Sequence, residues 1–191
     1  MPTQPCQPIS KPVRQLGRAL DMDSLDTSKF LDRLHCRNVS RLNALRTSSA
    51  TSGDPRVLEY NALHHLIKQK HHTSPSSRLF LVAVEYVFDD GCFKRANGDA
   101  LVFSHAINTL FVVETKILKA PAKTGNAKVL KAIHQATMCA SRLSSWIPHL
   151  INIDMKDGTT LGSVTIRRMI VTAVDRGGRV FSQDIRSQEI D

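Results

Sequence analysis

Apolar residues recur along the chain with two periods, and these divide much of it into helices and strands. Residues 54–70 keep apolar side chains three or four positions apart after an Asp54-Pro55 start, the spacing of a helix that packs one face on a core. The run from Arg78 to Phe88 is β-branched and aromatic, and the segments 99–105 and 109–117 repeat that character. Three such segments with short connections predict an antiparallel meander.

The last third of the chain predicts a long helix and further strands. Asn126 is placed to cap a helix that runs to about residue 146 and that Pro148 ends. Residues 163–175 predict a fourth strand, and residues 179–182 a short fifth one. The core order α-β-β-β-α-β predicts an α/β fold with a mixed central sheet of four to five strands flanked by helices.

The first 50 residues predict an N-terminal helical appendage to this core, which spans residues 54–191. Leucines and phenylalanine have helical spacing before and after residues 21–27, where acids and hydroxyls predict a stop and a new N-cap. The prediction is therefore two short helices, joined to the core by the Ser/Thr/Gly-rich loop 47–53.

The amino-acid composition indicates which class of partner the protein binds. The 191 residues include 26 Lys and Arg against 17 Asp and Glu, a net charge of +9 that favours nucleic acid or an acidic membrane surface. No apolar run is long enough for a membrane span or a signal peptide. The four cysteines have no zinc or redox spacing. We expect no membrane association and an intracellular protein, cytoplasmic or nuclear rather than mitochondrial.

Charged residues follow the apolar part of the third predicted strand. Period-two alternation puts Glu114 and Lys116 on one face, although a charge there needs a partner or a metal. A hairpin that turns between residues 106 and 107 brings Asp99 opposite Glu114. A salt bridge at a strand end would also explain Glu114 and Lys116. A second candidate, Glu85 in the first strand, is interpreted as a salt-bridge partner, with an additional acid as the alternative.

A further acid comes from the first core helix. Glu59 shares a helical face with apolar residues three, four and seven positions later, so it points along the buried stripe. Carboxylates gathered in one place repel one another, and a divalent cation relieves that repulsion. Hard oxygen ligands without His or Cys suit Mg²⁺ or Mn²⁺, so the sequence predicts a site for one of these cations.

The residues Asn97-Gly98-Asp99, then Glu114-Thr115-Lys116 at the end of an apolar strand, in this element order, resemble the PD-(D/E)xK nuclease superfamily over residues 54–182. Gly98 stands where that motif usually has proline. The resemblance implies that Asp99 and Glu114 bind catalytic Mg²⁺ or Mn²⁺ and that Lys116 positions or polarises the attacking water. It implies that Glu59 and the main-chain carbonyl of Thr115 complete the metal shell, and that Gln135 on the next helix reaches the site.

The long second helix has a polar face that includes Lys128, Lys131, Gln135 and Arg142, and this face could follow a phosphate backbone. The alternative is an ordinary solvated helix surface. The functional hypothesis is a Mg²⁺- or Mn²⁺-dependent nuclease, with DNA favoured over RNA as partner and a homodimer possible. The alternative is a non-catalytic nucleic-acid-binding or assembly protein on a nuclease-derived fold.

Overall fold

The computed structural model describes residues 7–8, 16, 24–71, 78–88, 96–120, 126–154 and 164–190. Its centre is a six-stranded mixed sheet in the order β1-β2-β3-β4-β5-β6. Strands β2 (Leu79–Phe88), β3 (Ala96–Ser104) and β4 (Thr109–Leu118) form the expected antiparallel meander. The long helix α4 (Ala127–Asp154) then leads into β5 (Thr165–Val174), which is parallel to β4.

The outer strands make the sheet mixed. Strand β6 (Arg186–Ile190) returns antiparallel to β5, and the two-residue β1 (Gln7–Pro8) lies parallel to β2. The predicted α/β class, flanking helices and core order are confirmed, but the predicted strand at 179–182 is wrong. That stretch leads into a 3-10 turn, η3 (Ser182–Asp184), which the paired side chains of Arg176 and Asp184 tie back to the preceding loop, so pairing with β5 begins only at Arg186.

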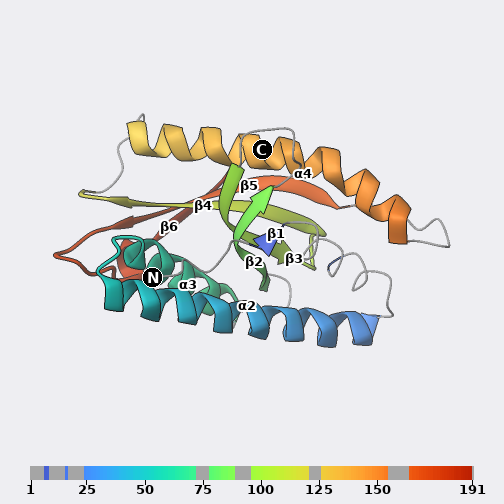
Figure 1. Cartoon of the computed structure of the whole chain (residues 1–191), viewed down its shortest axis with the longest axis horizontal. Coiled ribbons are helices and arrows are strands. Elements are labelled where there is room, and N and C mark those ends of the chain that lie inside the picture. Colours follow the sequence, from blue (N-terminus) through green and yellow to red (C-terminus); the bar gives the residue numbers. More distant parts are fainter. Residues whose placement is uncertain are drawn as a thin grey trace.

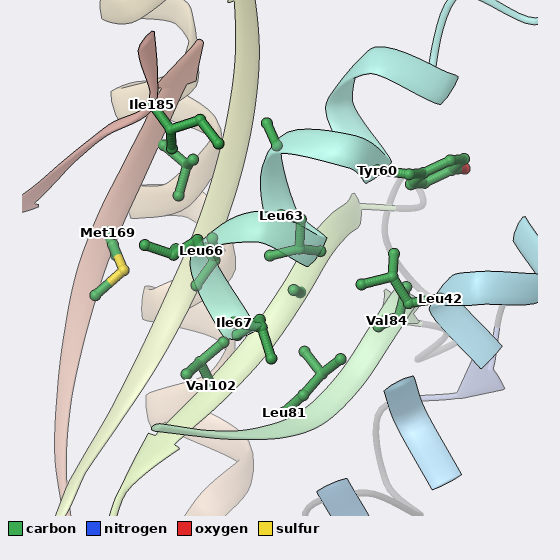
Figure 2. Close-up of a cluster of buried hydrophobic side chains, with 14 of the residues drawn as sticks. Leu42, Tyr60, Leu63, Leu66, Ile67, Leu81, Val84, Val102, Met169 and Ile185 are labelled. Carbon is green, nitrogen blue, oxygen red and sulfur yellow. The ribbon is translucent and has the colours of Figure 1, made fainter. Parts of the chain in front are cut away.

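Helices cover both sides of the sheet, with α4 on one side and α2 (Ser24–Ser52) and α3 (Val57–His71) on the other (Figure 1). Beneath α4, side chains such as Ala132, Ala136 and Leu143 pack on alternate residues of the central strands. Beneath α3, Leu63, Leu66 and Ile67 pack on the opposite set, and Leu42 of α2 joins them from the side (Figure 2). This alternation leaves β4 buried on both faces.

Helix α2 corrects the expectations for the N-terminal segment. The first of the two predicted short helices, before residue 21, lies outside the described residues apart from Leu16. The second is longer than expected: it is a helix of 29 residues that begins at Ser24, inside the predicted stop at 21–27, and includes most of the predicted loop 47–53. Hydroxyl groups in this stretch bond to carbonyls of the preceding turn, as Thr51 does to Thr47, so these hydroxyls have their partners within the helix. The helix ends at Gly53, with φ +70°. Asn38 ties α2 to the sheet by donating to the carbonyl of Val82 at 2.9 Å.

Helix α4 also runs further than expected. Asn126 caps it as predicted, because its side-chain oxygen accepts from the backbone N–H of Lys128 at 2.9 Å. The expectation that Pro148 ends the helix is wrong, since α4 continues to Asp154. A proline removes one helical hydrogen bond and crowds one carbonyl, which disfavours a helix interior without forbidding continuation. None of the helices in the described part of the chain has an apolar stretch sufficient to traverse a lipid bilayer.

Candidate active site

The site begins where β3 and β4 separate. The two strands pair from Ser104 with Thr109 to Ala100 with Val113, which is the predicted register, in which Asp99 comes opposite Glu114. The earlier residues of β3, 96–98, pair with β2 instead. In this opening Oδ2 of Asp99 accepts a hydrogen bond of 2.6 Å from the backbone N–H of Thr115. The Asp99 carboxylate thus accepts the hydrogen bond that a backbone carbonyl of β3 would otherwise accept, and this bond fixes it beside Glu114.

Glu114 is the most deeply buried of the acids. Its side chain is 1% exposed, and its Oε1 is buried without a hydrogen-bond partner. Its Oε2 lies 3.7 Å from Nζ of Lys116, which in turn lies 4.0 Å from Oε1 of Glu59 at the start of α3. The structure therefore brings Glu59, Asp99, Glu114 and Lys116 together as the sequence predicts, with the ammonium between an acid of the sheet and an acid of the helix.

Burial and mutual repulsion make these carboxyl groups hard to ionise. Burial raises the pKa of Glu114 to about 8, with the nearby Asp99 adding to the rise and Lys116 opposing it. Burial also raises the pKa of Glu59 to about 7, again with a contribution from Asp99. The pKa of Asp99 is raised by its burial, against the opposing effects of Lys116 and the Thr115 N–H. Near neutral pH, protons therefore compete with any cation for these carboxyl groups.

A fourth acid lies on the other side of Asp99. The pairs on either side, Val84 with Ala100 and Tyr86 with Gly98, leave Glu85 directly across from Asp99. Glu85 has a φ of +47°, a strained value for a side chain of this size. Its Oε1 accepts a 2.8 Å hydrogen bond from the Tyr60 hydroxyl of α3, in place of the expected salt bridge. Acids thus occupy one row across three neighbouring strands.

The surroundings of the acids explain why residue 98 is a glycine. A Cβ on Gly98 would collide with the ring of Tyr86, whose Cε1 would be 2.7 Å away. The fully buried Tyr86 and Cys139 of α4 are electrostatically coupled to Glu114 and Asp99, and burial raises the pKa of the Cys139 thiol to about 11. The Tyr86 ring of β2 and the protonated Cys139 thiol of α4 thereby border the site next to Glu114.

The remaining predicted residues lie on β4 and α4. Thr115 alternates to the face opposite Glu114, and its backbone N–H holds Asp99. Gln135 lies one turn before Cys139, and its Oε1 is buried without a hydrogen-bond partner. Lys128 donates from Nζ to the carbonyl of Ile117 at 3.1 Å. Two further cations of α4 are Lys131, which is exposed, and Arg142, which is partly exposed.

The donor chemistry fits a hard divalent cation, although the side chains are not gathered around one. Among the described residues, no three His, Cys, Asp or Glu side chains stand close enough to hold a metal ion. The unpartnered Oε1 of Glu114 and the crowded carboxylates of Glu59 and Asp99 are the oxygen ligands that Mg²⁺ or Mn²⁺ prefers. Lys116 now partly neutralises them, and a cation would complete that neutralisation.

Sequence reasoning missed the roles of Tyr60 and Tyr86. Tyr60 follows Glu59 directly and so points away from it on the helix, and only the fold shows that it reaches Glu85. The sequence places Glu85 on its strand, but only the pairing of β2 with β3 shows that it lies across from Asp99. These interpretations rest on the geometry of the chain itself, since no family model, curated protein or solved structure matches it.

Proposed function

We propose that this chain is a Mg²⁺- or Mn²⁺-dependent nuclease that hydrolyses phosphodiester bonds, with DNA preferred to RNA. The observation that carries the proposal is the buried carboxylate of Glu114, which has one unpartnered oxygen, lies across from Asp99 and is 3.7 Å from Lys116. Burying two adjacent acids costs several kcal/mol, so a ligand that requires them is the simplest reason for their presence. The net charge of +9 suits a polyanionic substrate.

Each residue then has a role that its position supports. Asp99, Glu114 and Glu59 would hold the cation together with the carbonyl oxygen of Thr115. When bound, the cation supplies Lewis-acid activation of water and neutralises charge on the phosphate. Lys116, held between two carboxylates, would orient the attacking water and stabilise charge that develops on the phosphate oxygens. Tyr60 holds the carboxylate of Glu85 in place through its hydroxyl.

The test is cleavage of labelled circular single-stranded, circular duplex and linear DNA, and of RNA, with Mg²⁺ or Mn²⁺. We expect cleavage, with a loss of at least about 100-fold in Asp99→Asn and Glu114→Gln, because both remove charge where transition-state charge must be balanced. Glu189→Gln is the matched control, since Glu189 is exposed and pairs with Arg167 at the sheet edge. Cleavage that persists in both site variants would contradict the proposal.

The second candidate is a non-catalytic nucleic-acid-binding or assembly protein. The observation that favours it is that Lys116 already pairs with both Glu59 and Glu114. Such an ion-paired cluster has no need of a cation, so Mn²⁺ would leave the melting temperature unchanged. A cation site instead raises the melting temperature with increasing Mn²⁺, and Glu114→Gln removes that rise.

A further inference from the structure

Helix α2 has a continuous row of basic residues. Lys29, Arg33, Arg37 and Arg41 follow one another at intervals of four, and from Thr27 to Ser52 the only acid is Asp32. Side chains four residues apart form a ridge that is inclined to the helix axis. Lys29, Arg33 and Arg37 are exposed and Arg41 is partly buried, so this basic ridge winds from the solvent side of α2 toward its packed side.

The buried end of the basic ridge reaches the acid cluster. Leu42, the residue after Arg41, packs in the same core as Val84, the residue before Glu85, which brings Arg41 near this acid (Figure 2). Arg41 accordingly lowers the pKa of Glu85, against the dominant effect of burial. The Nε of Arg41 is buried without a hydrogen-bond partner. The packed side of α2 is anchored in the fold by Leu31, Leu34 and Leu42, which are buried in the two cores. A rigid helix therefore presents a line of cations that ends beside the acids.

Asp32 does not interrupt the basic ridge. It neighbours Lys29 at the start of the ridge but turns to Arg78, with which it pairs at 2.8 Å, and lies 3.9 Å from His71. Successive residues of the ridge rise by about 6 Å, and the four together span about 18 Å along the helix. One strand of nucleic acid advances about 3.4 Å per phosphate, so the ridge is long enough to contact about five phosphates.

We infer that the basic ridge of α2 binds the phosphate backbone of the nucleic acid and leads it to the acid cluster. The inference rests on the proposed function and specifies how the substrate is held. It assigns this task to a helix outside the 54–182 segment that resembles nucleases. Arginine suits it because its planar guanidinium forms paired hydrogen bonds with phosphate oxygens. The four acids repel a polyanion, so cations must supply the attraction at their border.

The test measures binding without cleavage, by fluorescence anisotropy of a labelled single strand and a labelled duplex in EDTA over a series of salt concentrations. The ridge variant carries Arg33→Gln, Arg37→Gln and Arg41→Gln, and glutamine keeps the helical preference of arginine. The charge-matched control changes three exposed cations that do not belong to α2: Lys68→Gln, Lys70→Gln and Arg179→Gln. Circular dichroism establishes that each variant is folded.

We expect the ridge variant to lose about 10- to 100-fold in affinity at 0.1 M salt. Its slope of log K against log salt should become less negative by about 2 to 3, since each lost phosphate contact removes about 0.7 to 0.9. The control variant should keep most of the affinity and most of the salt dependence of the parent. If the ridge variant binds as tightly as the parent with the same slope, the inference is wrong. If the triple variant does not fold, the double variant Arg33→Gln/Arg37→Gln, which changes only exposed residues, takes its place. Unchanged affinity and slope in that variant would likewise contradict the inference.

Failure of this inference is distinguishable from failure of the proposed function. A parent protein that binds through the ridge but cleaves nothing supports the inference and contradicts the nuclease proposal. A parent that cleaves, with a ridge variant that binds and cleaves equally well, contradicts the inference alone.

Discussion

Replacing Glu114 with glutamine should stabilise the protein at alkaline pH. The ordinary pKa of this carboxyl, 4.5, is raised to about 8 in the folded protein, chiefly by burial. The folded state therefore holds a proton that the unfolded chain releases as pH rises above 4.5, so stability falls between pH 4.5 and pH 8 and stays lower above that. Glutamine has nearly the same shape and no charge to bury, so it removes this loss.

The magnitude follows from the size of that pKa change. Each pKa unit corresponds to about 1.4 kcal/mol, so the full change from 4.5 to about 8 amounts to at most about 5 kcal/mol. Asp99 titrates together with Glu114, so in the Glu114→Gln variant Asp99 still carries part of the buried negative charge. The gain is therefore smaller than the full amount. We therefore expect Glu114→Gln to gain about 2 to 4 kcal/mol at pH 9. At 2–4 °C per kcal/mol for a chain of this size, the melting temperature should rise by roughly 4 to 16 °C.

The assay is urea and thermal unfolding of the parent and variant in metal-free buffer at pH 5 and pH 9. The gain should be large at pH 9 and small at pH 5, where the parent carboxyl is protonated. Glu189→Gln serves as control, since its half-exposed carboxylate pairs with Arg167 at 3.7 Å and should change stability by less than about 0.5 kcal/mol. A Glu114→Gln protein that is no more stable than the parent at pH 9 would refute the picture of a buried, repelled carboxylate.

Three further predictions test the surroundings of the site. Gly98→Ala should cost about 1–3 kcal/mol, because its Cβ meets the Tyr86 ring, and in a double-mutant cycle Tyr86→Leu should recover much of that loss. Leu31→Ala and Leu42→Ala should each cost about 2–5 kcal/mol in urea unfolding, because both side chains are fully buried; a cost below 1 kcal/mol would show that α2 is dispensable to the core. Burial lowers the pKa of His64 from 6.5 to about 4, so the parent loses stability as pH falls through this range, and His64→Gln should flatten that loss in unfolding curves between pH 4 and 6.5.

The sequence was most informative where one periodic pattern had one structural solution. The strands of the meander and the start of α3 lie within three residues of the predicted positions, because β-branched runs bounded by turns leave little choice of register. The alignment of Asp99 with Glu114 followed from the same constraint, since a short hairpin fixes its pairs. Local signals and tertiary packing agree in this part of the chain.

The sequence was less informative where tertiary contacts override local signals. The hydroxyl-rich end of α2 looks like a loop, yet Ser49 is buried and the helix continues because its neighbours pack on β2 and α3. Glu85 could not be placed, because the positive φ that re-aims it is a property of the folded strand.

The acid cluster and the basic ridge are best explained together. Four carboxyl groups with raised pKa values, three of them near Lys116, make the folded state less stable at and above neutral pH than uncharged replacements would. The acid cluster would repel a polyanion, so nucleic acid could bind beside it only where positive charge is also present. The ridge of α2 supplies fixed positive charge at its border, and a divalent cation would supply it at the centre. Under the proposed function the two features act together: the arginines would hold phosphate while the acids bind the metal beside it.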